Sequence, residues 1–176
     1  MLKAQYEYEP SKENPFGKIS SHAPEQLTDF APMIGESKCE SISRAPDQTW
    51  NTPHKMLWRF KYIMNGMAVQ DEVLRTEAPN AGSIRQFNAD SAKWYVHYYT
   101  VGNPPSTLPS WEGTKTDDDK IILYREQKAP NGLDGYYRIT FFDITESSFE
   151  WIGEWVNMNE TVVFPTWKIS CTKIIR

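Results

Sequence analysis

Residues 54–77 read HKMLWRFKYIMNGMAVQDEVLRTE, and this stretch decides the fold that we expect. Its first half alternates, so that one face of an extended strand is apolar and mostly aromatic while the other carries three basic residues. The dipeptide Asn65-Gly66 readily adopts positive φ at both positions, which predicts a two-residue hairpin turn. The stretch therefore predicts two antiparallel strands, 54–64 and 67–77, with the aromatic face of the first pointing inward.

The same pattern of short strands and turns continues on both sides of this hairpin. Clusters of Asn, Asp, Gly, Pro and Ser separate the apolar runs, which is typical of tight connections. Beyond residue 33 no apolar period of helical length is present. The candidate strands are 34–43, 54–64, 67–77, 83–88, 93–101, 109–116, 120–128, 136–145, 149–156 and 163–175.

About ten antiparallel strands in a meander predict an all-β, up-and-down barrel, with a two-sheet sandwich as the alternative. Residues 1–22 are polar and contain Pro10, Pro15 and Gly17, which indicates a flexible N-terminal arm. A short helix from Pro24 to Met33 follows and is expected to plug one end of the barrel. We therefore expect one barrel domain over residues 23–176.

Alternation also predicts which side chains of the other strands face inward. In 149–156 the aromatic positions, including Trp151 and Trp155, oppose the two glutamates. Closing the barrel pairs the first strand with the last and brings Cys39 close to Cys171. Two buried thiols are the favoured interpretation. A disulfide is disfavoured in a reducing compartment, and no second ligand pair supports a metal site.

Composition narrows the range of partners. The chain has 176 residues and a formal net charge of −4, which argues against nucleic acid and against docking on an anionic membrane. No apolar run reaches the length of a membrane span, and the first residues lack the apolar core of a signal peptide. We therefore expect a cytoplasmic protein with no nucleic-acid or membrane partner, either a monomer or a weak homodimer.

Aromatic residues are unusually frequent: seven Trp, nine Tyr and eight Phe make up 14% of the chain. Some must fill the core, and the remainder favour the walls of a pocket. The inward or outward direction of His97, Glu126 and Asp71 stays open, because both faces of their strands are plausible interiors. If Asp71 and Arg75 face inward, we expect them to pair with each other. The candidate ligand-binding residues are Trp58, Tyr62, His97, Tyr99, Trp111, Tyr124, Glu126, Tyr137, Trp151 and Trp155.

Five segments resemble the bacterial calycin-like barrels, a lipocalin-like group that includes many domains of unknown function. They are QLTDFAPMIGESKCE (26–40), FKYIMNGMAVQDEV (60–73), KWYVHYY (93–99), FEWIGEW (149–155) and PTWKISCTKI (165–174). The chain departs from the family at Ser37, where the family has Trp. Lipocalins and fatty-acid-binding proteins, better-known calycins, carry small apolar ligands. The resemblance thus implies a barrel and a small-molecule ligand, but it assigns no catalytic residue.

The favoured function is the binding of a small apolar or aromatic molecule inside the barrel, with no cofactor and no metal. The first alternative is an enzyme of the isomerase, cyclase or decarboxylase type, with His97 or Glu126 as its acid/base. The second is a structural module whose aromatic residues simply fill the core. Haem binding through His97 or His54 is a weaker option. No nucleophile motif, phosphate loop or metal-ligand motif favours another reaction class.

Overall fold

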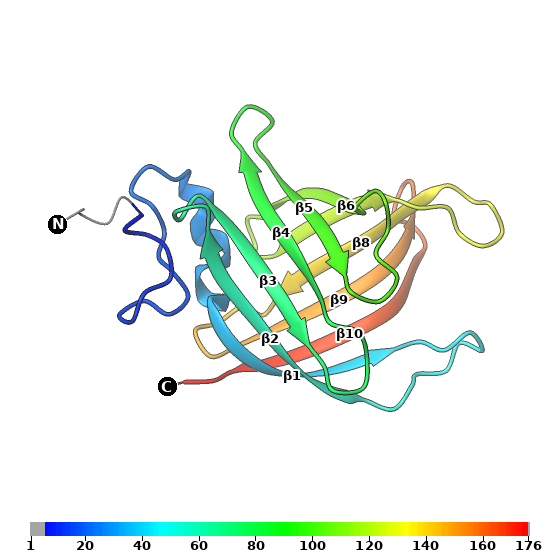
Figure 1. The fold of residues 1–176 in the computed structure, drawn as a ribbon. Helices are drawn as coiled ribbons and strands as arrows, with labels where there is room; N and C mark the ends of the chain where they lie inside the picture. Colours follow the sequence, from blue (N-terminus) through cyan, green and yellow to red (C-terminus); the bar gives the residue numbers. More distant parts are fainter. Residues whose placement is uncertain (1–5, 176) are drawn as a thin grey trace.

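Ten antiparallel strands close into a barrel in the computed structural model, which describes residues 6–175 (Figure 1). Each strand pairs with its neighbours in sequence, and the first pairs with the last. This order confirms the up-and-down barrel and excludes the two-sheet sandwich. The elements are η1 (Glu25–Met33), β1 (Gly35–Ser43), β2 (His54–Ile63), β3 (Ala68–Leu74), β4 (Ala81–Asn88), β5 (Lys93–Thr100), β6 (Ser110–Lys115), β7 (Ile121–Glu126), β8 (Gly135–Phe142), β9 (Ser148–Asn157) and β10 (Val163–Lys173).

The one helix within residues 6–175, η1, is of the 3₁₀ type and closes one end of the barrel, on the left in Figure 1. A 3₁₀ helix has three residues per turn, so residues three apart lie on one side. Leu27, Phe30 and Met33 follow this spacing and are all buried. The expected plug is therefore present, with its apolar side inserted into the barrel end.

The direction of the side chains in β2 agrees with the alternation in the sequence. Its aromatic face is buried, and its basic residues lie on the outer face. One of these, Arg59, pairs across the sheet with Glu36 at 2.8 Å. The aromatic face of β2 thus forms one wall of the interior.

The hairpin between β2 and β3 occurs where Asn65-Gly66 predicts it, but the connection is longer than two residues. Ile63 pairs with Ala68, which leaves four residues in the turn. Met64, Asn65 and Gly66 all have positive φ. The prediction of a two-residue turn was therefore wrong in length.

The segment before η1 lies against this same hairpin. The backbone N–H of Tyr8 donates to Asn65 Oδ1 at 3.1 Å, and the N–H of Ser20 donates to the carbonyl of Gly66 at 3.1 Å. The N–H of Tyr62 donates to the carbonyl of Phe16 at 2.9 Å. Residues 1–5 of the predicted arm lie outside the described residues, and the flexibility of residues 1–22 stays a prediction.

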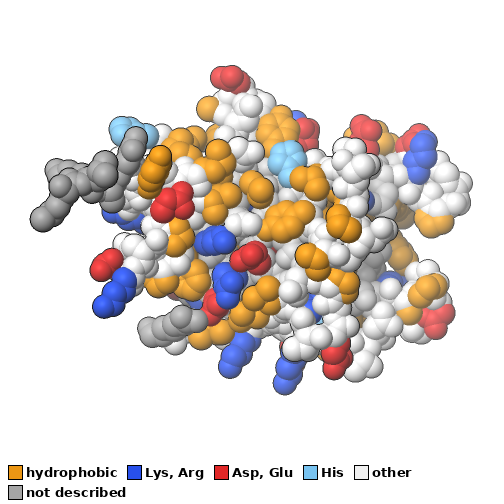
Figure 2. Space-filling view, in the orientation of Figure 1, with side chains coloured by type: hydrophobic (Ala, Val, Ile, Leu, Met, Phe, Trp, Pro, Cys, Tyr) orange, Lys and Arg blue, Asp and Glu red, His pale blue; other side chains and the backbone are white. Residues whose placement is uncertain are grey.

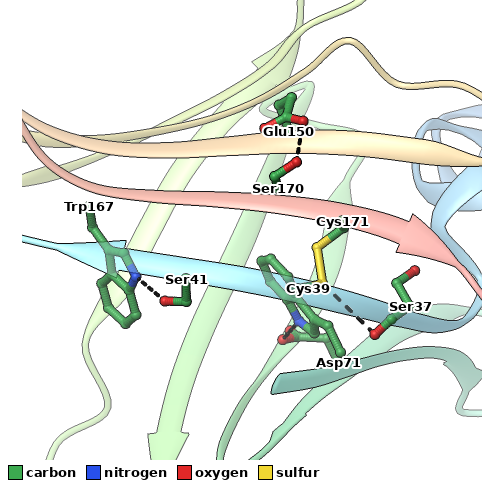
Figure 3. The surroundings of a disulfide bond; sticks show 9 residues. Ser37, Cys39, Ser41, Asp71, Glu150, Trp167, Ser170 and Cys171 are labelled. Carbon is green, nitrogen blue, oxygen red and sulfur yellow. Dashed lines mark hydrogen bonds between the residues drawn. A yellow bond between two sulfur atoms is a disulfide. The ribbon is translucent and has the colours of Figure 1, made fainter. Parts of the chain in front are cut away.

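A disulfide joins β1 to β10 at the line where the barrel closes (Figure 3). Cys39 and Cys171 are direct partners in the register, with Cα atoms 4.2 Å apart and a sulfur–sulfur bond. The expectation of two free thiols was therefore wrong. The prediction that the two cysteines lie close together is confirmed. It depends on alternation and barrel closure and not on the redox state of the thiols.

The barrel has a filled half and a hollow half. β1 begins directly after η1, so the up-and-down order puts four connections at the helix end. Phe30, Phe60, Trp94 and Phe141 pack edge to face near this end. The other five connections surround the open end: 44–53, 75–80, 101–109, 127–134 and 158–162.

Candidate ligand-binding cavity

A cavity of about 340 Å³ occupies the open half of the barrel. This volume falls near the lower limit of ligand pockets, roughly 300–1,000 Å³. Ten strands enclose a wider lumen than the eight that side chains alone fill, which accounts for the unfilled space. The lining residues are Met56, Trp58, Asp71, Val73, Arg75, Ala81, Gly82, Ser83, Arg85, Val96, Tyr98, Pro109, Trp111, Arg125, Gln127, Tyr137, Ile139, Trp151, Trp167 and Ile169.

A buried ion pair lies within this lining. Asp71 of β3 and Arg85 of β4 are only 2% exposed, and Arg85 Nη1 donates to Asp71 Oδ1. The other carboxylate oxygen accepts a hydrogen bond from Trp58 Nε1 at 2.6 Å. Both oxygens of Asp71 are therefore engaged, as a carboxylate removed from water requires.

The guanidinium of Arg85 also lies against the aromatic core of the filled half. Its central carbon is 5.1 Å from the ring centre of Phe30, 5.0 Å from that of Phe60 and 5.7 Å from that of Phe141. Aromatic faces attract a desolvated cation at such distances. Arg85 therefore contacts both halves of the barrel interior.

Arg125 lines the cavity without a carboxylate partner among the described residues. It lies 4.4 Å over the ring of Trp111 and donates to Gln127 Oε1 at 2.6 Å. Burial lowers the pKa of the Arg125 guanidinium, because desolvation disfavours the charged form; nearby Tyr137 opposes this shift. The side chain thus presents a partly desolvated positive charge to the cavity.

Tyr137 is held in place by a close approach to the neighbouring strand. Its hydroxyl is within 3.0 Å of Thr166 Oγ1, and Trp111 Nε1 donates to its carbonyl at 3.2 Å. A Cβ at Gly153 would come within 2.3 Å of this hydroxyl, so a larger residue there would have to displace the tyrosine. Burial raises the pKa of Tyr137, whereas its hydrogen bond to Thr166 opposes the shift.

Arg75, at the end of β3, is the third arginine of the lining. Its side chain makes no ion pair or hydrogen bond within residues 6–175, and its Nε is buried without a partner. We expected it to pair with Asp71, but Asp71 pairs with Arg85 instead. That pairing leaves Arg75 unneutralised.

Four of the ten residues predicted from the sequence line this cavity: Trp58, Trp111, Tyr137 and Trp151. Trp155 lies opposite Tyr137 in the register and shares its face of the sheet. Tyr62 also faces inward, but in the filled half, where its hydroxyl is 3.5 Å from the carbonyl of Leu27. Burial raises the pKa of Tyr62.

The remaining four predicted residues lie on the outer face. In β5 the inward positions are taken by Val96 and Tyr98, so His97 and Tyr99 point outward. His97 Nδ1 is 2.7 Å from Ser110 Oγ, and Tyr99 accepts from Gln70 Nε2 at 2.6 Å.

In β7 the same alternation directs Tyr124 and Glu126 outward. Tyr124 donates to Glu160 at 2.9 Å, and Glu126 is exposed. The two acid/base candidates, His97 and Glu126, are thus not in the cavity. On the face that Figure 2 shows, hydrophobic side chains are interspersed with charged and other side chains.

The arginines were absent from the predicted set of ligand-binding residues. Charged side chains are usually exposed, so sequence reasoning favours the surface for Arg85 and Arg125, and it considered Arg75 only as an inward-facing partner of Asp71. A signal was nevertheless present for Arg125, which shares a strand face with Ile121 and Leu123, two fully buried residues. Arg85 gave a weaker signal, since both faces of its strand mix polar and apolar residues.

Within residues 6–175, no three His, Cys, Asp or Glu side chains gather as a set of metal ligands. In the same range no helix has the length and apolar character needed to cross a membrane. A scan against protein-family models and a search of curated proteins find no match to this chain.

Proposed function

We propose that this protein binds a small molecule with an apolar or aromatic body in the open half of its barrel. The observation that carries this proposal is the cavity of about 340 Å³, whose lining includes four of the seven tryptophans. A barrel with a purely structural role has no need of such a space, because unfilled volume forfeits packing contacts. The plugged end and the meander order also support a calycin-like classification of the barrel.

The rim of the open end supports entry of an apolar ligand at this side. Exposed apolar side chains occur in all the open-end connections except 75–80, and they continue into the start of β10. Exposed apolar groups around a pocket are typical of binding sites. The side chains are Trp50, Val101, Leu108, Leu133, Met158, Val162, Val163 and Phe164.

Native mass spectrometry of protein purified without added ligand is the experiment that tests the proposal. We expect a stoichiometric small molecule that denaturing extraction releases for identification. A protein that is empty and whose tryptophan fluorescence no small aromatic compound changes would contradict the proposal.

A matched pair of variants locates the binding. Ala81 lines the cavity, whereas Ala89 is exposed in the turn between β4 and β5. We expect Ala81→Phe to fill the cavity and abolish binding, and Ala89→Phe to bind as the wild type does. Equal binding by both variants would place the ligand elsewhere on the protein.

A separate proposal, which rests on the sequence alone, is that the protein is cytoplasmic. The disulfide between Cys39 and Cys171 argues against this location, because disulfides persist mainly in oxidising compartments. Thiol alkylation of protein trapped directly from cells tests this location. Free Cys39 and Cys171 support the cytoplasm, whereas a fully oxidised pair contradicts it.

A further inference from the structure

The charge of the cavity is opposite in sign to that of the whole chain. Three arginines and one aspartate line it, a formal charge of +2, whereas the chain carries −4. No glutamate and no second aspartate is among the lining residues. An acidic protein with an excess of arginine around this apolar cavity requires a local explanation.

Asp71 cannot neutralise all three arginines. One of its oxygens accepts a hydrogen bond from Arg85 and the other accepts one from Trp58. Its negative charge therefore already neutralises Arg85 within a buried pair. The excess charge is thus that of Arg75 and Arg125, which form no ion pair within the described residues. Arg75 directly follows β3 and Arg125 belongs to β7, and these two strands lie in different parts of the barrel wall.

Each of these two guanidinium groups is partly removed from water. Arg125 lies over the ring of Trp111, and burial lowers the pKa of its guanidinium. Arg75 has a buried nitrogen with no partner. A cation with an unfilled donor in an apolar cavity costs free energy, and a bound anion offsets that cost by pairing with it.

We propose that the ligand is an organic acid, whose anionic head pairs with Arg75 and Arg125 and whose apolar body lies against the tryptophans and aliphatic side chains of the cavity. This inference rests on the proposed function and specifies the ligand class. Guanidinium groups suit a carboxylate in particular, since their planar donors match its two oxygens. The size of the cavity restricts the body to a small ring system or short chain.

Isothermal titration calorimetry with naphthoate and naphthamide tests the ligand class. The two compounds share the ring and differ in the charge of the head group. We expect wild-type protein to bind naphthoate at least about tenfold more tightly, because hydrogen bonds to charged groups are the stronger ones. Equal affinity for the two compounds would overturn the organic-acid proposal and leave the binding function standing. If neither compound binds, the proposed function loses its support as well.

Variants assign the head group to the two arginines. Arg125→Gln and Arg75→Gln should each weaken naphthoate binding by about tenfold or more and leave naphthamide binding little changed. Lys168→Gln is the control, because it removes the same charge from the exposed outer face of β10. An equal loss for both compounds, or the same loss in Lys168→Gln, would overturn the assignment. Arg75 is only half-buried at a strand end, so its variant keeps the test valid if Arg125→Gln does not fold.

Discussion

Asp71 shows how one residue can determine both the hydrogen bonding and the charge balance of the barrel interior. It accepts hydrogen bonds from two side chains, Trp58 and Arg85, on the strands to either side of its own. Without it, the most deeply buried arginine would have no counter-charge. The pair therefore connects the packing of the barrel with the electrostatics of its cavity.

Replacing Asp71 by Asn keeps the shape of the side chain and removes its charge. We expect the free energy of unfolding to fall by about 3–5 kcal/mol, because Arg85 remains buried and unpaired. Urea denaturation measures the change. Glu72→Gln is the matched control, since Glu72 lies on the outer face in partly exposed pairs with Arg59 and Lys61, and its loss should cost less than about 1 kcal/mol. An equal loss of unfolding free energy in both variants would contradict the prediction that burial makes the Asp71–Arg85 pair important for stability.

Buried tyrosines predict a loss of stability at alkaline pH. Burial raises the pKa of Tyr62 above its value in the unfolded chain, about 10. The stabilisation is then complete below that unfolded value and is lost as the pH rises through the folded pKa. We expect Tyr62→Phe to lose less stability than the wild type between about pH 9 and 12 in urea denaturation. Tyr6→Phe, at an exposed position, should follow the wild type; a Tyr62→Phe variant that does so too would contradict the prediction.

At the scale of elements, η1 determines which half of the barrel is filled. Phe30 is its central buried residue and packs on Trp94 with ring centres 4.9 Å apart. Phe30→Ala should lower the free energy of unfolding by about 3–5 kcal/mol and extend the cavity toward the helix. Denaturation together with titration of a longer ligand measures both effects. Thr28→Ala, on the exposed side of η1, should cost no more than about 1 kcal/mol.

The disulfide between β1 and β10 provides a second test at the scale of elements. Removing the disulfide with Cys39→Ser and Cys171→Ser should lower the free energy of unfolding by about 2–5 kcal/mol, since the crosslink spans 132 residues. Reductant should produce the same change in the wild type and none in the double variant. A wild-type protein unaffected by reductant would contradict the disulfide as a source of stability. Trp167 Nε1 still donates to Ser41 Oγ across the same two strands, at 2.7 Å, so the barrel should remain closed (Figure 3).

The elements were predictable from the sequence to different degrees. In β2 the basic residues all occupy one face, so its orientation followed directly. In β5 both faces carry aromatic residues, and alternation alone could not distinguish Trp94 and Tyr98 from His97 and Tyr99. Only the register with β4, which pairs inward-facing Arg85 with Val96, decides the matter. Local patterns thus predict the fold, whereas the cavity depends on pairings between strands.

At the scale of the whole molecule, the two halves of the barrel should differ in stability. The filled half has a packed aromatic core, and the open half surrounds a space with fewer contacts. We expect amide hydrogen exchange to be slower near η1 than at the open ends of β3, β4, β7 and β8. A ligand at 100 times its dissociation constant stabilises the native state by about 2.7 kcal/mol and should slow exchange mainly in the open half. Uniform exchange in the free protein would contradict this division.

The disulfide also determines what a single cut in the backbone can do. Cys39 and Cys171 enclose all nine strand-to-strand connections, including the exposed loop 127–134. A protease that cleaves once in that loop leaves two pieces joined through sulfur, each still paired along its edges with the other. Such a nicked molecule would migrate as two fragments only after reduction, and the protein could lose the continuity of its backbone without falling apart.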